Sequence, residues 1–252
     1  MFRPISRLTR RLYHPNTLEH ALPKELYPLT YSRDSIQYRV LEHALKVNVP
    51  LHGFNERAIV ASLAALGCNS SMLSVLGAPN SPSFFNASPA VLELVKFHLV
   101  TKRLDLTKGL EESNEEPTLE QLFLKRLQMN EPISSHLSQM LSYLSIPGEF
   151  LVQTALPELH RLSDDMVYFS REPDSHDFAW YSKRMAISCA YISSELFMAQ
   201  DKSDSFRETI EFAQEKLHKV TKLGEYYNNT EEYLWYTLLM SVNLAKSQMT
   251  RG

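Results

Sequence analysis

One stretch decides the fold class: residues 52–67 read HGFNERAIVASLAALG. Gly53 supplies a turn, and Asn55 is a residue type that accepts hydrogen bonds from the first free N–H groups of a helix. The apolar residues that follow recur at helical spacing, and Gly67 suits the left-handed position just after a helix ends. The sequence therefore predicts a tight turn and then a helix that runs from Asn55 to Leu66.

Helical patterns flank this stretch on both sides. Before it, apolar residues between Ile36 and Leu45 fall on one helical stripe. After it come a short apolar piece, Met72 to Leu76, and then Ser88-Pro89, which opens a long helix with proline at its first position. We expect residues 35–108 to form an N-terminal three-helix unit of the helix-turn-helix type.

A second helical set follows an acidic segment at residues 109–117. Thr118 and Gln121 form a capping box, and Pro157 should kink or break the helix predicted for residues 150–169. Three more helices are expected, capped by Asp177, by Asp204 or Ser205, and by Thr230, and ending near Ala199, Leu223 and Gln248.

Together these patterns predict an all-α bundle. Only 7 of 252 residues are glycine, and no alternation of apolar and polar residues is longer than a few residues. The sequence therefore contains few of the glycines that tight β-hairpin turns require. We assign residues 118–229 to a larger helical part and residues 230–252 to a last, amphipathic helix.

Residues 1–13 are typical of a mitochondrial presequence. No acid precedes Glu19, and the apolar residues Phe2, Ile5, Leu8 and Leu12 share one helical face with arginines elsewhere on its surface. Arg11-Leu12-Tyr13 resembles a matrix-processing site, which predicts cleavage before His14. The alternative is a basic, frayed terminus. Removal of Arg3, Arg7, Arg10 and Arg11 changes the formal net charge from −3 to −7, which argues against a general nucleic-acid binder.

Prolines, apolar stretches and cysteines indicate what kind of protein follows the presequence. Residues 14–34 contain three prolines and predict an extended arm before folded structure begins near Ser35. No stretch approaches the roughly 18 apolar residues that span a bilayer, so any membrane contact would be peripheral. Cys68 and Cys189 lie far apart in apolar surroundings, which favours packing thiols over a disulfide or metal site.

The helix order of residues 36–100 resembles the N-terminal unit of Tet-repressor-type regulators, and a larger helical part follows, as in that class. The resemblance by itself implies DNA binding. However, no Lys or Arg occurs between Arg57 and Lys96, so the expected recognition helix, Ser70 to Leu76, offers no cation to phosphate and no arginine to guanine. A DNA-binding regulator is thus the less favoured interpretation.

Four segments give a narrower resemblance: GAPNSPSFF at 77–85, PELHRLSDDM at 157–166, WYSKR at 180–184 and LFMAQD at 196–201. Together they are similar to the fungal branch of the mitochondrial ubiquinone-biosynthesis lipid-binding family, accessory partners of the demethoxyubiquinone hydroxylase, over roughly residues 28–251. The resemblance implies a Tet-repressor-like fold used for lipid binding, a homodimer, a peripheral membrane helix and presentation of polyprenylated quinone intermediates to the hydroxylase.

The family resemblance places a partner-binding patch on six residues: Asp164, Asp165, Met166, Trp180, Tyr181 and Arg184. Trp180 and Tyr181 are adjacent, so a helix buries at most one of them comfortably, and the other is free to face outward. An exposed Trp beside Tyr and Arg has the composition of an interface hot spot. The alternative is structural: Trp180 packs near Pro157, and Arg184 pairs with Asp164 or Asp165.

Candidate lipid-binding residues lie on the same helix, because Met185, Cys189, Ile192 and Leu196 form a flexible, sulfur-containing stripe. Such a stripe is also common in an ordinary core. In the last helix, Leu234, Trp235, Leu238, Leu239 and Val242 form a broad apolar face. That helix could dock on the bundle or on a dimer partner, or it could lie on the membrane, as the family resemblance implies.

Catalytic motifs are missing from the sequence. Glu215-x-x-His218 occurs once, whereas a carboxylate-bridged di-iron bundle needs that motif twice. We therefore expect a non-enzymatic protein without cofactor, metal or nucleic acid. The presequence predicts the mitochondrial matrix, and the family resemblance implies a peripheral position at the matrix face of the inner membrane and an isoprenoid quinone or phospholipid as the ligand. The alternatives are an enzyme in its own right, a partner-binding scaffold without lipid, and the DNA-binding regulator.

Overall fold

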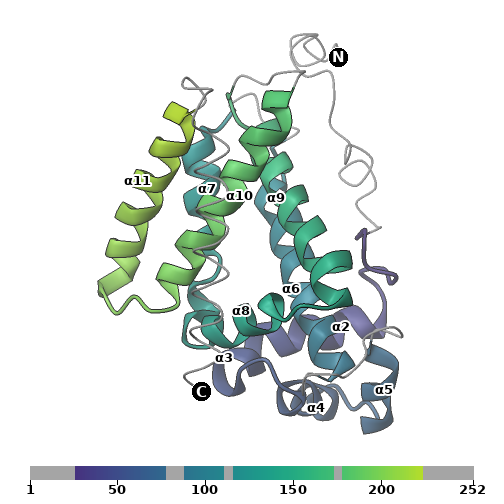
Figure 1. Ribbon diagram of the computed structural model, residues 1–252. Coiled ribbons are helices and arrows are strands. Elements are labelled where there is room, and N and C mark those ends of the chain that lie inside the picture. The colour runs from purple at the N-terminus through teal and green to yellow at the C-terminus, as the bar shows by residue number, and fades with distance from the viewer. Residues whose placement is uncertain (1–25, 78–87, 111–115, 173–177, 224–252) are drawn as a thin grey trace.

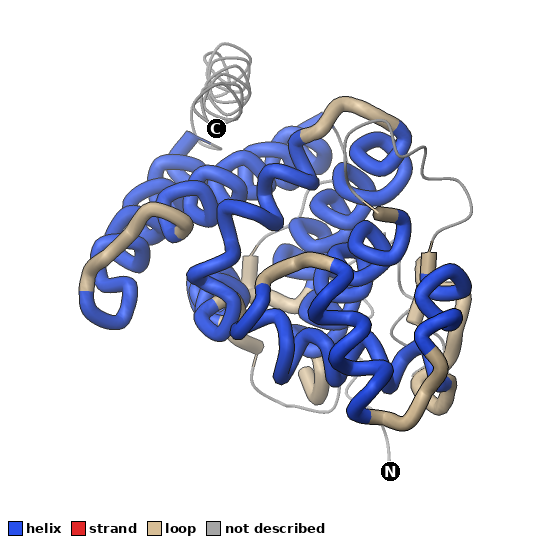
Figure 2. The backbone as a smooth tube through the Cα atoms, turned by 90° about the horizontal axis from the view of Figure 1, so that it is seen from below, coloured by secondary structure: helices blue, strands red, loops and turns tan. Residues whose placement is uncertain are grey.

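The computed structural model describes residues 26–77, 88–110, 116–172 and 178–223. Within these ranges the chain forms helices joined by loops, and Figure 2 shows no strand among them. The all-α prediction is confirmed for this part of the chain. The presequence, most of the arm, the acidic segment at 111–115, the caps at Asp177 and Thr230 and the last helix lie outside the described residues.

The N-terminal unit begins with α2 (Ile36–His43), which runs through the π-helical segment η1 (Ala44–Asn48) into α3 (Val49–His52). It continues with α4 (Glu56–Ala65), η2 (Ser70–Met72), α5 (Leu73–Leu76) and the long α6 (Pro89–Thr107). Ser35 caps α2, Ser88 precedes Pro89 at the start of α6, and both starts agree with the sequence prediction.

The predicted turn and caps around α4 are confirmed. Asn55 Oδ1 accepts a hydrogen bond from the Ala58 N–H at 3.0 Å. At the other end, the Gly67 N–H donates to Ala64 O and the Cys68 N–H to Leu63 O, with Gly67 at φ +67°. These two hydrogen bonds form a Schellman motif, which favours glycine at the left-handed position.

Gly53 brings the turn against the second helical set. Its φ is +79°, and a Cβ there would lie 2.5 Å from Gln139 Oε1. The Gln139 side chain hydrogen-bonds to both backbone groups of Phe54. Its oxygen accepts from the Phe54 N–H at 2.9 Å, and its nitrogen donates to Phe54 O at 3.1 Å. The turn therefore ties the N-terminal unit to α8.

The second set comprises α7 (Leu119–Gln128), η3 (Glu131–His136), α8 (Leu137–Ser145), η4 (Leu151–Ala155), α9 (Leu156–Tyr168), α10 (Phe178–Met198), η5 (Asp204–Phe206) and α11 (Arg207–Leu223). Thr118 and Gln121 form the predicted capping box. Pro157 stands in the first turn of α9, directly after the π-helical η4. The helix is not broken there, because helical structure continues from η4 into α9, and only the hydrogen-bonding pattern changes, just before the proline.

In Figure 1, α9, α10 and α11 lie side by side, with α10 in the middle and α6 and α7 behind them. Two hydrophobic clusters fill the described interior. The first lies among α2 to α6 but also takes Ile133, Leu137 and Met140 from the second set. The second lies among α7, α9, α10 and α11 and takes Leu106 from α6. Each cluster therefore draws residues from both sides of the acidic segment.

Two expectations need correction. Structure does not begin only at Ser35, because Leu26 and Leu29 are already buried in the first cluster. Neither Asp204 nor Ser205 caps α11. Instead Asp201 accepts from the Thr209 N–H at 2.9 Å, and Ser203 Oγ accepts from the Glu208 N–H at 3.1 Å. The cap comes earlier in the sequence because Ser205 has a left-handed φ of 53°.

Candidate functional site

The helix pair α9 and α10 carries most of the residues singled out from the sequence. The two helices lie side by side in Figure 1. The Trp180 ring of α10 lies 5.9 Å from the His160 ring of α9, and Arg184 of α10 reaches Asp164 of α9. The candidate partner-binding residues of the two helices therefore do come together.

Arg184 and Asp164 form a buried ion pair. Arg184 Nε lies 2.6 Å from Asp164 Oδ1, and both side chains are fully buried. The guanidinium also stacks 3.7 Å from the centre of the Trp180 ring and donates to the Trp180 carbonyl oxygen at 3.2 Å. Arg184 thus holds the first turn of α10 against α9, which is the structural alternative stated for this residue.

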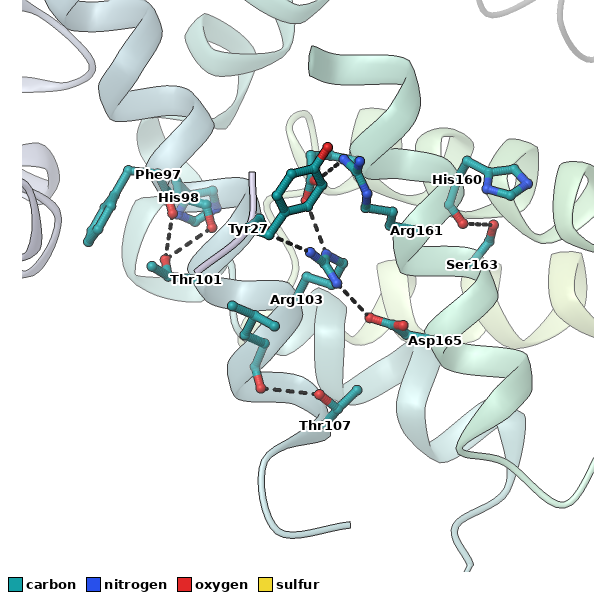
Figure 3. Close-up of polar contacts among 12 residues, drawn as sticks. Tyr27, Phe97, His98, Thr101, Arg103, Thr107, His160, Arg161, Ser163 and Asp165 are labelled. Atoms are coloured by element: carbon teal, nitrogen blue, oxygen red, sulfur yellow. Dashed lines mark hydrogen bonds and ion pairs between the residues drawn. The ribbon is translucent and has the colours of Figure 1, made fainter. Parts of the chain in front are cut away.

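Asp165 belongs to a second ionic network, centred on Arg103 of α6. Arg103 Nη1 lies 3.0 Å from Asp165 Oδ2, and Arg103 Nε lies 3.1 Å from Glu158 Oε2. Arg161 approaches the other Glu158 oxygen at 2.6 Å, and Arg103 Nη2 donates to the backbone oxygen of Tyr27 at 3.2 Å. Figure 3 shows the Arg103 side chain between Tyr27 and Asp165. Two cations and two carboxylates balance in charge, so this network fastens the arm, α6 and α9 together.

Only one of the six candidate partner-binding residues is exposed. Tyr181 is 62% exposed, and its ring packs edge-on against Trp180 at 4.6 Å. The remaining five are buried, namely Asp164, Asp165, Met166, Trp180 and Arg184. The structure confirms that only one of the adjacent aromatic residues is buried. The expectation of an exposed Trp is wrong, because stacking on Arg184 and packing on His160 take Trp180 inside.

The candidate lipid-binding residues continue the exposed line of Tyr181 along α10. Met185 is 49% exposed, Ile192 and Leu196 are half-buried, and Cys189 is buried. Burial raises the pKa of the Cys189 thiol. None of these four side chains belongs to either hydrophobic cluster of the described residues. Met185, Ile192 and Leu196 form an outward apolar stripe on α10, with the buried Cys189 between them, and we call these four residues the α10 stripe.

The candidate membrane-contact residues Leu234, Trp235, Leu238, Leu239 and Val242 lie outside the described residues. Over the ranges that the structure does describe, no helix has the length and apolar character needed to cross a bilayer.

The described residues contain no cluster of His, Cys, Asp and Glu suited to a metal ion. Glu215 and His218 are exposed on α11, and Glu215 pairs with Lys219, so this motif lies on a solvated helix face. Glu158 points to Arg103 while His160 packs on Trp180, so they lie on different faces. Burial lowers the pKa of His160 despite the nearby Asp164.

Sequence reasoning missed Arg103 and Glu158 as buried residues. A signal was present, because α6 has apolar residues around its whole circumference. Some charged residues of such a helix face the interior, and each of these needs a partner. The identity of that partner, 55 positions away, had no local signal.

Comparison with known proteins gives consistent matches. A model of the COQ9 family matches residues 152–224, which span η4 to α11. The chain is 59% identical to a Saccharomyces cerevisiae protein named "Ubiquinone biosynthesis protein COQ9, mitochondrial", over 96% of this chain and 95% of that protein. It is 56% identical to the Eremothecium gossypii protein of the same name, over 98% and 99%. The Homo sapiens protein of that name is 31% identical, over 77% of this chain and 60% of its own length.

Proposed function

Because this chain belongs to the COQ9 family, whose relatives are named as mitochondrial ubiquinone biosynthesis proteins, we propose that it is a non-enzymatic lipid-binding protein. It binds polyprenylated ubiquinone intermediates at the matrix face of the inner membrane and presents them to the demethoxyubiquinone hydroxylase. It acts as a homodimer, and the hydroxylase rather than this chain carries out the oxidation.

One observation supports this proposal above the others, the α10 stripe. A helix in the middle of a bundle normally buries its apolar residues, yet this line leaves Met185 49% exposed and Ile192 and Leu196 half-buried. Val152 and Leu156, at the start of α9, are also exposed apolar residues. Exposed apolar surface of this kind marks contact with a ligand, a partner or a membrane.

The physics of the ligand explains why a partner is needed. Burying an isoprenoid tail gains about 25 cal/mol per Å² relative to water, but the tail is equally apolar surrounded by lipid. Transfer from the bilayer to the α10 stripe is therefore nearly neutral in free energy. Contact with the membrane surface and with the hydroxylase must supply the net driving force.

Tyr181 is the residue of the patch that can touch the hydroxylase directly. Tyr is enriched among residues that dominate binding energy at interfaces. The ring of Trp180 behind it and the buried Arg184–Asp164 pair fix its position. The other patch residues thus act by holding Tyr181 in place rather than by contact.

Affinity capture of the hydroxylase tests this role. Tyr181→Lys should reduce capture at least tenfold while leaving the circular dichroism spectrum and the bound lipid unchanged, because the side chain is already in solvent. Val75→Lys is the matched control, since Val75 is equally exposed but lies on α5. Equal capture by both variants would remove Tyr181 from the interface.

A further inference from the structure

A second buried polar cluster lies between α6, α7 and α10, apart from the α9–α10 site. Its centre is Asn130, whose Oδ1 accepts from Arg126 Nη1 at 2.8 Å and lies 3.3 Å from His98 Nε2. The Asn130 amide nitrogen donates to Glu195 Oε1 at 2.7 Å, and the Tyr191 hydroxyl donates to the same oxygen at 2.5 Å. All five residues are buried, and the proposed function uses none of them.

Two atoms of this cluster have no partner among the described residues. They are Arg126 Nε and His98 Nδ1, on side chains that are each only 1% exposed. Arg126 also has no carboxylate in ion-pair contact within that part of the chain, because Glu195 is held by Asn130 and Tyr191 instead. The buried Arg103 and Arg184 both have direct carboxylate partners. A buried guanidinium without a counter-ion is strongly unfavourable.

Lys102 adds a second cation. It follows His98 by four positions on α6, so the two share a helix face. Lys102 is half-buried and forms no ion pair with any described residue. Burial, and then the charge of Arg126, lower the pKa of Lys102, and the same two effects lower the pKa of His98. The charge of the exposed Asp105 works in the opposite direction on Lys102 and raises its pKa.

The local charge is therefore positive. Among the buried and half-buried groups, Arg126 and Lys102 contribute two positive charges and Glu195 contributes one negative charge, whereas Asp105 is exposed and its charge is screened by solvent. A protein that placed two repelling cations together around buried, unpartnered nitrogen atoms would lose stability unless an anion joined them. Arg126 and His98 both contact Asn130 Oδ1, and Lys102 follows His98 by one turn of α6. Donors from two helices, α6 and α7, suit a tetrahedral oxyanion better than a planar carboxylate.

We propose that Arg126, Lys102 and His98 bind a phosphate group, which the Arg126 Nε–H and the Lys102 ammonium contact directly. A bound phosphate also favours the protonated form of His98, whose Nδ1 then becomes a donor. The phosphate comes either from a phospholipid headgroup or from free inorganic phosphate. The headgroup form rests on the proposed lipid-binding function, whereas the free-phosphate form does not.

The test uses the mature chain after delipidation in phosphate-free buffer. Inorganic phosphate is titrated at constant ionic strength while the Tm is recorded. In a parallel arm, the protein is incubated with phosphatidylcholine vesicles, separated from them by gel filtration and assayed for retained phosphorus. Arg126→Met and Lys102→Met are compared with Lys125→Met, which removes a neighbouring cation that donates to the Leu106 carbonyl oxygen.

We expect wild type and Lys125→Met to bind, and Arg126→Met to bind at least tenfold more weakly. Without phosphate, Arg126→Met should be at least as stable as wild type, because the uncompensated charge is gone. A Tm response to inorganic phosphate identifies the free anion, and retained phosphorus alone identifies the headgroup. If Arg126→Met does not fold, Lys102→Met decides.

Three outcomes overturn the site: no binding in either arm, binding unchanged by Arg126→Met, or, if that variant does not fold, binding unchanged by Lys102→Met. Lipid retention that survives both substitutions overturns the phosphate site and leaves the proposed function intact. A response to inorganic phosphate without lipid retention supports the site and contradicts the proposed function.

Discussion

Replacing Asp164 with alanine tests whether the ionic residues of the partner patch are structural. The change removes the carboxylate 2.6 Å from Arg184 and leaves that guanidinium in a fully buried position. Breaking a buried pair from one side typically costs about 3–5 kcal/mol. For a domain of this size, each kcal/mol shifts the Tm by about 2–4 °C, so we expect a loss of roughly 6–20 °C.

The double variant Asp164→Ala/Arg184→Met separates charge from packing. Exchange of a buried pair for apolar side chains is often neutral or stabilising, so the second substitution should recover much of the lost stability. Part of the loss remains, because the stacking of Arg184 on Trp180 is also removed. Urea unfolding followed by circular dichroism measures all three proteins. An Asp164→Ala loss below about 1 kcal/mol would refute the structural role.

Three further predictions concern stability and reactivity. Gly53→Ala should cost at least about 1 kcal/mol more than Gly67→Ala in urea unfolding, because both have positive φ but only the Gly53 Cβ would displace Gln139 from Phe54; equal costs would contradict this. Burial depresses the pKa of His98, so the unfolded chain binds a proton at a higher pH than the folded protein does. The free energy of unfolding should therefore fall as the pH drops below about 6.5, by up to about 1.4 kcal/mol per pH unit, and half-buried His160 contributes in the same direction. If His98→Gln leaves the dependence of stability on pH unchanged, His98 is excluded as its source. Because burial raises the Cys189 thiol pKa, iodoacetamide should alkylate Cys189 slowly in the native protein and rapidly in urea, and fast native labelling would place this thiol at the surface.

Local features of the fold could be read from the sequence because their causes are local. The Asn55 cap, the Gly67 end and the Thr118 capping box each depend on residues within five positions of one another. The buried apolar residues of α7, Leu119, Leu122, Phe123 and Leu127, likewise recur at helical spacing. The all-α class follows from such signals.

The cap of α11 shows where local reasoning stops. Asp204 is a good capping residue type, but the chain passes through a left-handed turn at Ser205 and Phe206 before the helix starts. That turn places Asp201 over the first free N–H groups. Nothing in the residue types distinguishes Asp201 from Asp204, because the choice depends on how α11 packs beside α10.

The Arg184–Asp164 pair was the structural alternative read from the sequence, but the complete burial of these charges and the partner of Asp165 were beyond sequence reasoning. Asp164 and Asp165 are consecutive, polar and near a Trp, which is the composition of a surface patch. They are buried because Asp164 faces Arg184 of α10 and Asp165 faces Arg103 of α6. These partners lie 20 and 62 positions away, and only the packed fold brings them together.

The most direct test of the account is mass spectrometry of an organic extract of the mature protein, purified without detergent. The account predicts a polyprenylated quinone intermediate or a phospholipid at close to one molecule per chain. The charged substitutions Met185→Asp and Ile192→Asp in the α10 stripe should strongly reduce the amount of bound lipid, while Val75→Asp should not. Protein that folds normally yet carries no more lipid than an unrelated protein prepared in the same way would contradict lipid binding by this chain.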